Sequence, residues 1–145
     1  MIARETIYAA LFNLLASTTG LKTASRRVKF WGDVAPADQP ALFLVQKSEA
    51  AKITTKLPTI WTLHADIVLY ANNGGQGNDF LPPMTQLNPI IDLIVSKLLP
   101  GSGLEEQTLG GLVERCRIEG DIATDEGALG DQAIVIIPIT ILVPQ

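Results

Sequence analysis

The stretch Thr59–Tyr70 (TIWTLHADIVLY) constrains most strongly how this chain can fold. Its apolar side chains occupy alternate positions: Trp61, Leu63, Ala65, Ile67 and Leu69. Successive side chains of a β-strand point to opposite faces, so this alternation predicts a strand with one apolar and one mixed face. The length of the stretch and its β-branched and aromatic residues favour a place in the middle of a sheet.

Two segments have helical periodicity. The segment 3–17 carries an apolar stripe formed by Ile7, Leu11, Leu14 and Leu15. The residues that follow, 17–20, are polar and end in glycine, as expected where a helix ends. A second stripe lies in the segment 87–98. Pro89 is compatible with a helix only in its first turn, which predicts that Asn88 caps this second helix.

Four more segments predict strands. Ser25–Trp31 and Leu112–Ile118 alternate in character, and Ala41–Gln46 is a compact apolar run. Gln132–Val143 is apolar on both faces, which is typical of a strand covered on both sides. Because Pro138 has no backbone N–H group, we expect a sheet edge or a bulge at that position.

Two polar segments predict connections between strands. Ser48–Pro58 has little pattern, and we interpret it as a long hairpin connection that an oligomer partner could order. Glu119–Asp131 is acidic and predicts a loop, with an extended start at about Asp121–Thr124.

The 145 residues therefore predict one α+β domain, with two amphipathic helices packed on one face of a largely antiparallel sheet of about five strands. Two helices cannot cover both faces of so apolar a sheet. The opposite face is left to water or to a neighbouring subunit. A hydrophobic content of 47% fits surface that is buried in an oligomer.

Composition excludes several classes of protein. Cys116 is the single cysteine, so no disulfide within the chain is expected, and one cysteine with one histidine cannot form an ordinary zinc site. A net charge of −4 argues against broad affinity for a nucleic-acid backbone. No apolar run approaches the length of a bilayer helix, and the start MIARETIY lacks a cleavage site. We therefore expect neither a membrane nor a signal peptide.

Two loops resemble ligand sites and fail the detailed patterns. The loop Asn72–Asn78 is rich in glycine but lacks both the G-K-[ST] ending and the G-x-G-x-x-G spacing of phosphate-binding loops. The acidic segment does not fit a calcium loop, because Ile122 and Ala123 occupy ligand positions. We expect no cofactor and no metal. A loop that orders on assembly is the preferred interpretation of the first segment, with contacts from Asn72, Asn73, Gly74 and Gly75.

His64 and Asp66 lie on one face of the predicted central strand and are the best candidates for catalysis. They form half of a catalytic triad, but the chain has no G-x-S-x-G motif, and Cys116 lies two strands away in the sequence. A histidine with a hydrogen-bonding neighbour is the ordinary explanation. We expect no enzyme.

Charged residues predict a contact between identical subunits. Arg26, Arg27 and Lys29 form a basic cluster near Lys22, and Asp121, Asp125 and Glu126 form an acidic one. Complementary clusters can set the register between subunits, while two solvated faces are the plain alternative. Lys52 and Lys56 of the polar connection are further candidate contacts.

Several segments together resemble the tail terminator, or tail completion, proteins of long-tailed bacteriophages. In chain order they are SRRVKFW, PADQPALFLVQ, TLHADIVLY, LNPIIDLI, QTLGGLV and RIEGDIATDEGALGDQAI. The resemblance implies a small α+β subunit of a hexameric ring on the last ring of the tail tube. Such a ring stops tube growth, binds the tail tube protein and the neck or head-completion protein, and lets genomic DNA pass.

This resemblance implies a structural virion protein at the head-proximal end of the tail, made in the bacterial cytoplasm, with no catalytic residues. A head-side connector protein and a small ligand-binding α+β domain that uses His64 and Asp66 remain as alternatives.

Overall fold

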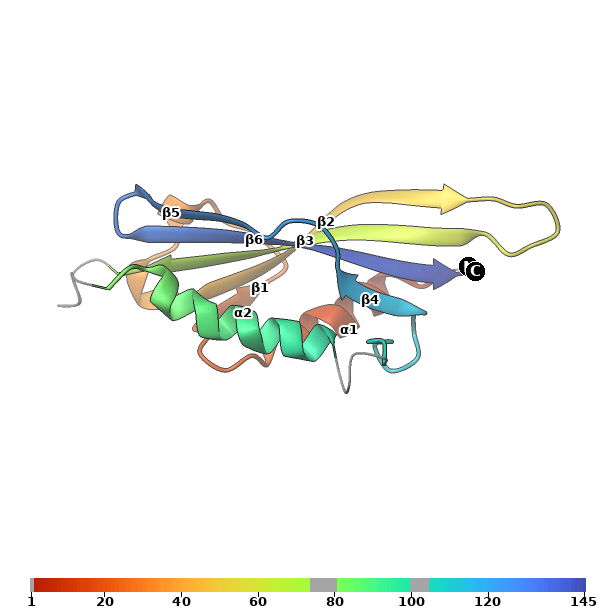
Figure 1. Ribbon diagram of the computed structural model, residues 1–145, viewed down its shortest axis with the longest axis horizontal. Coiled ribbons are helices and arrows are strands. Elements are labelled where there is room, and N and C mark those ends of the chain that lie inside the picture. The colour runs from red at the N-terminus through yellow and green to blue at the C-terminus, as the bar shows by residue number, and fades with distance from the viewer. Residues whose placement is uncertain (1, 74–80, 100–104) are drawn as a thin grey trace.

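A computed structural model describes residues 2–73, 81–99 and 105–145 of the chain. The elements in order are α1 (Arg4–Ala16), β1 (Thr23–Ser25), β2 (Ala41–Lys52), β3 (Ile60–Asn72), α2 (Met84–Leu98), β4 (Arg115–Ile118), β5 (Ala123–Leu129) and β6 (Gln132–Pro144), with 3₁₀ turns at Trp31–Asp33 and Pro36–Asp38. Figure 1 shows α1 and α2 on the same side of the sheet. The expected α+β fold is confirmed, with six strands in the described residues rather than about five.

The sheet has the strand order β1-β2-β3-β6-β4, and β5 also pairs with β6. Only β1 runs parallel to its neighbour, and the other described pairs are antiparallel. β3 lies between β2 and β6, which confirms the central position that its alternation predicts.

One hydrophobic core fills the space between the helices and the sheet. The inner side chains of β3, from Leu63 to Leu69, are at most 1% exposed. They pack against Ile137 and its neighbours on β6 and against the apolar stripes of both helices, whose buried residues are Ile7, Tyr8, Leu11, Leu15, Leu87, Ile90, Ile94 and Leu98. Burying these side chains supplies most of the driving force for folding, at about 1.5–3 kcal/mol for each large one.

Two strand predictions and one predicted connection require correction. The strand expected at Ser25–Trp31 is β1, which ends at Ser25 because only three residues pair with β2. The strand expected at Leu112–Ile118 begins at Arg115. The connection expected at Ser48–Pro58 is shorter, because β2 continues to Lys52 through a register shift between Gln46 and Glu49 and stays paired with β3.

The loop expected at Glu119–Asp131 is wrong for most of its length, and its expected extended start at Asp121–Thr124 overlaps a strand only at Ala123 and Thr124. Most of it is β5, which pairs with β6 through Ala123–Glu126 and Leu129. The acidic residues obscured this strand in the sequence, and main-chain pairing with β6 explains why it forms.

The expected cap at Asn88 is wrong, because α2 begins at Met84 and contains Pro89 in its interior. The carboxylate of Glu126 accepts a hydrogen bond from the Met84 N–H at 3.1 Å. An acceptor at a helix N-terminus satisfies a free N–H group and interacts favourably with the helix dipole. Support from β5 therefore extends the helix upstream of the position that the proline alone predicts.

Pro138 lies at a local edge, as expected. β5 pairs with β6 up to Ile136, and β4 pairs with the same edge from Ile139 onward. Pro138 falls in the gap between them, and its carbonyl accepts the Glu119 N–H at 3.2 Å. The expectation that β6 is covered on both faces is wrong for the single chain, because Ile136 is 38% exposed.

Candidate functional site

The face of the sheet opposite the helices is a surface that the chain itself covers only in part; we call it the open face. The strand register places Asp66 and Val68 of β3 beside Pro138 and Ile136 of β6. These four side chains are half-buried or exposed, whereas their sequence neighbours on the helix side are buried. The alternation seen in the sequence thus produces one closed and one open face.

A small second cluster covers one end of the open face. Val34, Ala41, Phe43 and Tyr70 are buried together there, and the rings of Phe43 and Tyr70 lie 5.5 Å apart. The Tyr70 hydroxyl donates a hydrogen bond to the Lys29 carbonyl at 2.8 Å. Burial raises the pKa of Tyr70, so the hydroxyl keeps its proton and remains a donor. These contacts hold the segment 29–34 against the sheet.

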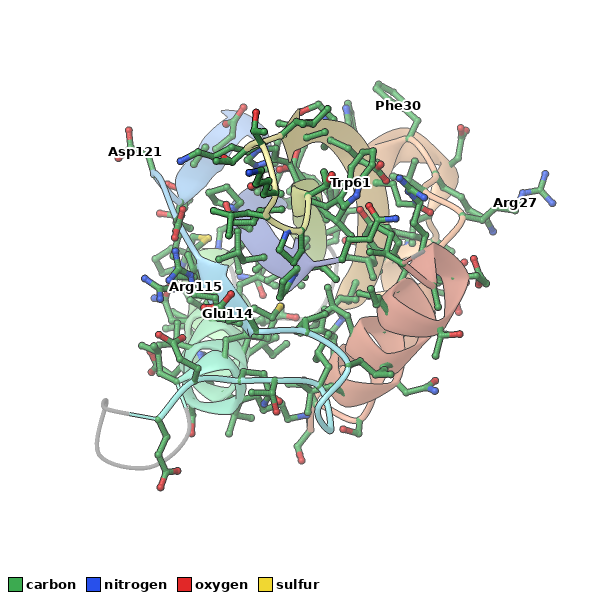
Figure 2. The ribbon with its side chains drawn as sticks, turned by 90° about the vertical axis from the view of Figure 1, so that its right-hand side faces the viewer. Arg27, Phe30, Trp61, Glu114, Arg115 and Asp121 are labelled. Carbon is green, nitrogen blue, oxygen red and sulfur yellow. The ribbon has the colours of Figure 1, made fainter. Side chains whose placement is uncertain are left out.

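The three basic candidates are not equivalent. Arg26 forms an ion pair with Glu5 of α1, donates to Gln46 Oε1 at 3.2 Å, and lies over the Tyr8 ring at 6.0 Å. Hydrogen bonding to Arg26 lowers the pKa of Glu5. Arg27 and Lys29 are exposed, and Figure 2 shows Arg27 pointing away from the body of the protein. Arg26 therefore acts within the chain, and Arg27 and Lys29 are presented to solvent.

An open groove of about 550 Å³ lies beside Arg26 and Arg27. Its lining comes from α1, the end of β1 and the outer edge of β2: Glu5, Ser25, Arg26, Arg27, Leu44, Val45 and Gln46. The groove begins where β1 ends, because the chain turns away from β2 after Ser25.

The acidic candidates lie at the other edge of the sheet. Asp121 precedes β5, and Asp125 and Glu126 belong to it; all three are exposed. Glu126 also caps α2, as described above. Figure 2, which looks along the length of the molecule, shows Asp121 on the side opposite Arg27. The structure therefore separates the basic and acidic clusters instead of bringing them together within one chain.

Lys52 and Lys56 lie on the hairpin that joins β2 to β3, which projects from one end of the molecule (Figure 1). Residues 46–58 are all exposed, and Lys56 has a positive φ of 66° in the turn. Ile53 and Leu57 beside them are 80% and 64% exposed. Attention to charge alone missed these two apolar side chains, which lie four positions apart in the same turn.

The four loop candidates are only partly described. Gly74 and Gly75 lie outside the described residues. Asn72 donates to Gln132 Oε1 at 3.0 Å, and Asn73 Oδ1 accepts from Gln86 Nε2 at 3.2 Å. Asn73 also donates a side-chain hydrogen bond to the Leu81 carbonyl. These two asparagines connect β3, β6 and α2 within the chain.

The residues considered for catalysis lie on different strands, His64 and Asp66 on β3 and Cys116 on β4. Asp66 forms an ion pair with Lys47 of β2 at 3.5 Å. Cys116 is fully buried, and burial raises the pKa of its thiol to about 12, so it is protonated at neutral pH. Within residues 2–73, 81–99 and 105–145, no group of three or more histidine, cysteine or acidic side chains could hold a metal ion.

Sequence reasoning missed three contacts that tie the chain together. Arg4 of α1 donates to the Glu49 carboxylate at 2.8 Å and lies 4.8 Å from the centre of the Trp61 ring. Lys97 of α2 donates to the Leu14 carbonyl at the end of α1 at 2.9 Å. In each case the partners are far apart in the sequence, so no local sequence pattern predicts the contact.

These features define an α+β fold in which helices cover one face of the sheet and the two edges of the sheet differ in charge. No protein-family model matches the chain, and no curated protein matches it. A solved structure aligns over 97% of this chain and 96% of its own length, at 16% identity and a TM-score of 0.47. Similarity at that level carries no inference about function. Neither α1 nor α2, the helices of the described segments, is long and apolar enough to cross a membrane.

Proposed function

We propose that this protein is a structural subunit that caps the tail tube of a long-tailed bacteriophage as a homo-oligomeric, hexameric ring. In this role it ends tube polymerisation and forms the surface for joining the head. The proposal starts from the resemblance of six successive segments to tail terminator proteins and is supported by the shape and charge of the subunit.

The observation that carries the proposal is the unlike character of the two sheet edges. A ring of identical subunits needs a heterologous interface, in which one surface of each subunit meets a different surface of the next. Arg27 lies beside the outer edge of β2, where it lines the groove, and Asp121 and Asp125 lie at the β5 edge. Opposite charges on opposite sides favour head-to-tail contacts and disfavour contacts between like edges.

The open face gives a second line of support. Val68, Ile136 and Pro138 form an apolar surface that the helices do not reach. Exposed apolar side chains at Phe30, Ile53 and Leu57 extend apolar contact area to other parts of the subunit. A monomer gains nothing from this surface, whereas neighbouring subunits, a tail tube or a neck protein would bury it.

The acidic balance of the chain also fits this role. A net charge of −4 gives little attraction for a phosphate backbone. Genomic DNA would therefore pass through such a ring without being held. We assign no catalytic role to His64, Asp66 or Cys116.

Tail-tube polymerisation tests the proposal. The tube protein of the same phage is allowed to polymerise alone and with increasing amounts of the purified protein, and tube lengths are measured by electron microscopy. We expect shorter tubes that carry a ring at one end, and a purified protein that forms rings with a central hole. Unchanged tube lengths at a molar excess of this protein would refute the terminator role.

A binding experiment separates the terminator from the head-side connector. Immobilised protein is incubated with tube protein and with neck protein separately. A terminator retains both, whereas a head-side connector retains only neck components.

A further inference from the structure

The outer edge of β2 is open for most of its length. β1 pairs only with Ala41, Leu42 and Phe43, and from Leu44 to Lys52 no strand of the described chain lies on the outer side of β2. A strand edge of this kind presents unpaired N–H and C=O groups and is a template for a further strand.

The groove of about 550 Å³ lies along the start of this open edge. Leu44, Val45 and Gln46 form its β2 side, and it continues the line of β1 beyond Ser25. Glu5 neutralises Arg26 inside the groove, and the exposed Arg27 leaves a positive charge at its rim. The site is therefore shaped for an extended segment and charged for an acidic one.

The outer edge of β5 is the second open edge. In the described chain β5 pairs with β6 alone. Its register with Ile136 and Ile134 places Ala123 and Asp125 on the open face of the sheet, and Asp121 lies just before it. β5 is an extended, acidic, seven-residue segment that already belongs to this protein.

We propose that β5 of one copy adds as a strand to the free edge of β2 of the next copy, in the groove beside Arg27. This inference rests on the proposed ring and names its subunit contact. Strand addition supplies main-chain hydrogen bonds, and the side chains at the rim supply selectivity. Asp121 and Asp125 of the added strand lie close to Arg27 at the rim.

A second copy fits this edge better than an unrelated peptide for a geometric reason. β2 and β5 lie toward opposite edges of one sheet, so each subunit offers both halves of the contact (Figure 2). Repetition of a heterologous contact produces a closed ring when the rotation closes. The contact would join the sheets of all subunits into one continuous band.

Charge reversal in two separate chains tests this contact. Arg27→Glu and Asp125→Arg each place like charges at the interface, and each should raise the protein concentration for half assembly on the order of tenfold or more. Equal amounts of the two variants, once mixed, should form rings again, because every contact between unlike variants then joins opposite charges at positions 27 and 125. Mass measurement by light scattering follows assembly. Asp92→Arg on the exposed side of α2 is the matched control and should leave assembly unchanged.

Recovery on mixing is the decisive result. Circular dichroism and thermal unfolding establish that each variant is folded before mixing. Full assembly of both single variants, failure of the mixture to recover, or a wild-type protein that stays monomeric would each overturn the inference.

A cross-link gives an independent measurement. Val45→Cys and Ala123→Cys are placed in separate chains, mixed, and treated with a short bismaleimide. We expect a linked dimer, and none from Val45→Cys with Ser96→Cys on α2; the native Cys116 is buried and does not react. If no link forms while the protein still makes rings that shorten tubes, the strand contact is wrong and the terminator role stands. If the link forms but tube length is unaffected, the contact stands and the terminator role fails.

Discussion

Ile136 and Ile137 are adjacent in β6 and point to opposite faces of the sheet. The same substitution at each position therefore compares how much each face contributes to the stability of the subunit. Ile137 is 0% exposed and packs under the helices, whereas Ile136 is 38% exposed on the open face. We expect Ile137→Ala to destabilise the subunit strongly and Ile136→Ala to affect assembly more than folding.

Burial sets the size of each effect. Removing three carbon atoms from a fully buried isoleucine loses about 2.4 kcal/mol of transfer free energy. At Ile137 the cavity left behind adds to this loss, and we expect about 4 kcal/mol in total. At Ile136 the fraction already exposed reduces the transfer loss to about 1.5 kcal/mol, and the open surface lets neighbours relax without a cavity. The expected difference is therefore about 2.5 kcal/mol.

Urea unfolding followed by circular dichroism measures both values. The protein is kept dilute enough to be monomeric, because assembly adds to apparent stability by mass action. The denaturant slope should be unchanged in both variants, so that a shift in midpoint reports stability. At higher concentration, Ile136→Ala should also raise the concentration for half assembly. Equal losses at the two positions, within about 0.5 kcal/mol, would refute a core confined to one face.

Three further predictions test single contacts. Because burial raises the Cys116 pKa to about 12 from 9.0, the folded chain retains this proton longer than the unfolded chain. The free energy of unfolding should therefore fall as the pH rises from 9.0 to about 12. The fall should be less steep in Cys116→Ala, and urea titrations at several pH values measure both slopes. Lys97→Met removes hydrogen bonds from Nζ to the end of α1, including one of 2.9 Å to the Leu14 carbonyl. It should cost about 2 kcal/mol by urea unfolding, whereas the exposed Lys22→Met should cost less than about 0.5 kcal/mol; similar losses would contradict the capping role. Gly120 has a φ of +110°, and an added Cβ would lie 3.2 Å from Pro138 Cγ. Gly120→Ala should lower the midpoint of thermal unfolding more than Gly110→Ala, where φ is also positive but nothing lies within 4 Å.

Elements with a strong apolar period were predictable. The central strand and the first helix follow from spacing, because a side chain that must be buried repeats with the period of the backbone that carries it. The final strand follows from its long run of apolar, β-branched residues. The local edge at Pro138 was predictable for a similar reason, since a missing N–H group is a property of the residue itself.

Elements held by their neighbours were not predictable. The second half of β2 is largely polar, and Thr124, Asp125 and Glu126 of β5 are polar or acidic. Both segments are strands because β3 and β6 offer main-chain partners. The early start of α2 depends on the Glu126 carboxylate, 42 positions away. In contrast, Ser25–Trp31 alternates like a strand, but only its first residue lies in one because the chain leaves β2 there.

The candidate contacts divide in the same way. Charge counting located the basic and acidic clusters, because charge belongs to the residue and is read directly. Only the tertiary structure determined that Arg26 is paired with Glu5, that Arg27 remains exposed, and that the clusters occupy opposite sides of the sheet. The sequence alone thus determined which segments must be buried, since that follows from each side chain's affinity for water. The tertiary structure decided which edges stay open, because pairing between strands depends on partners that no local pattern specifies.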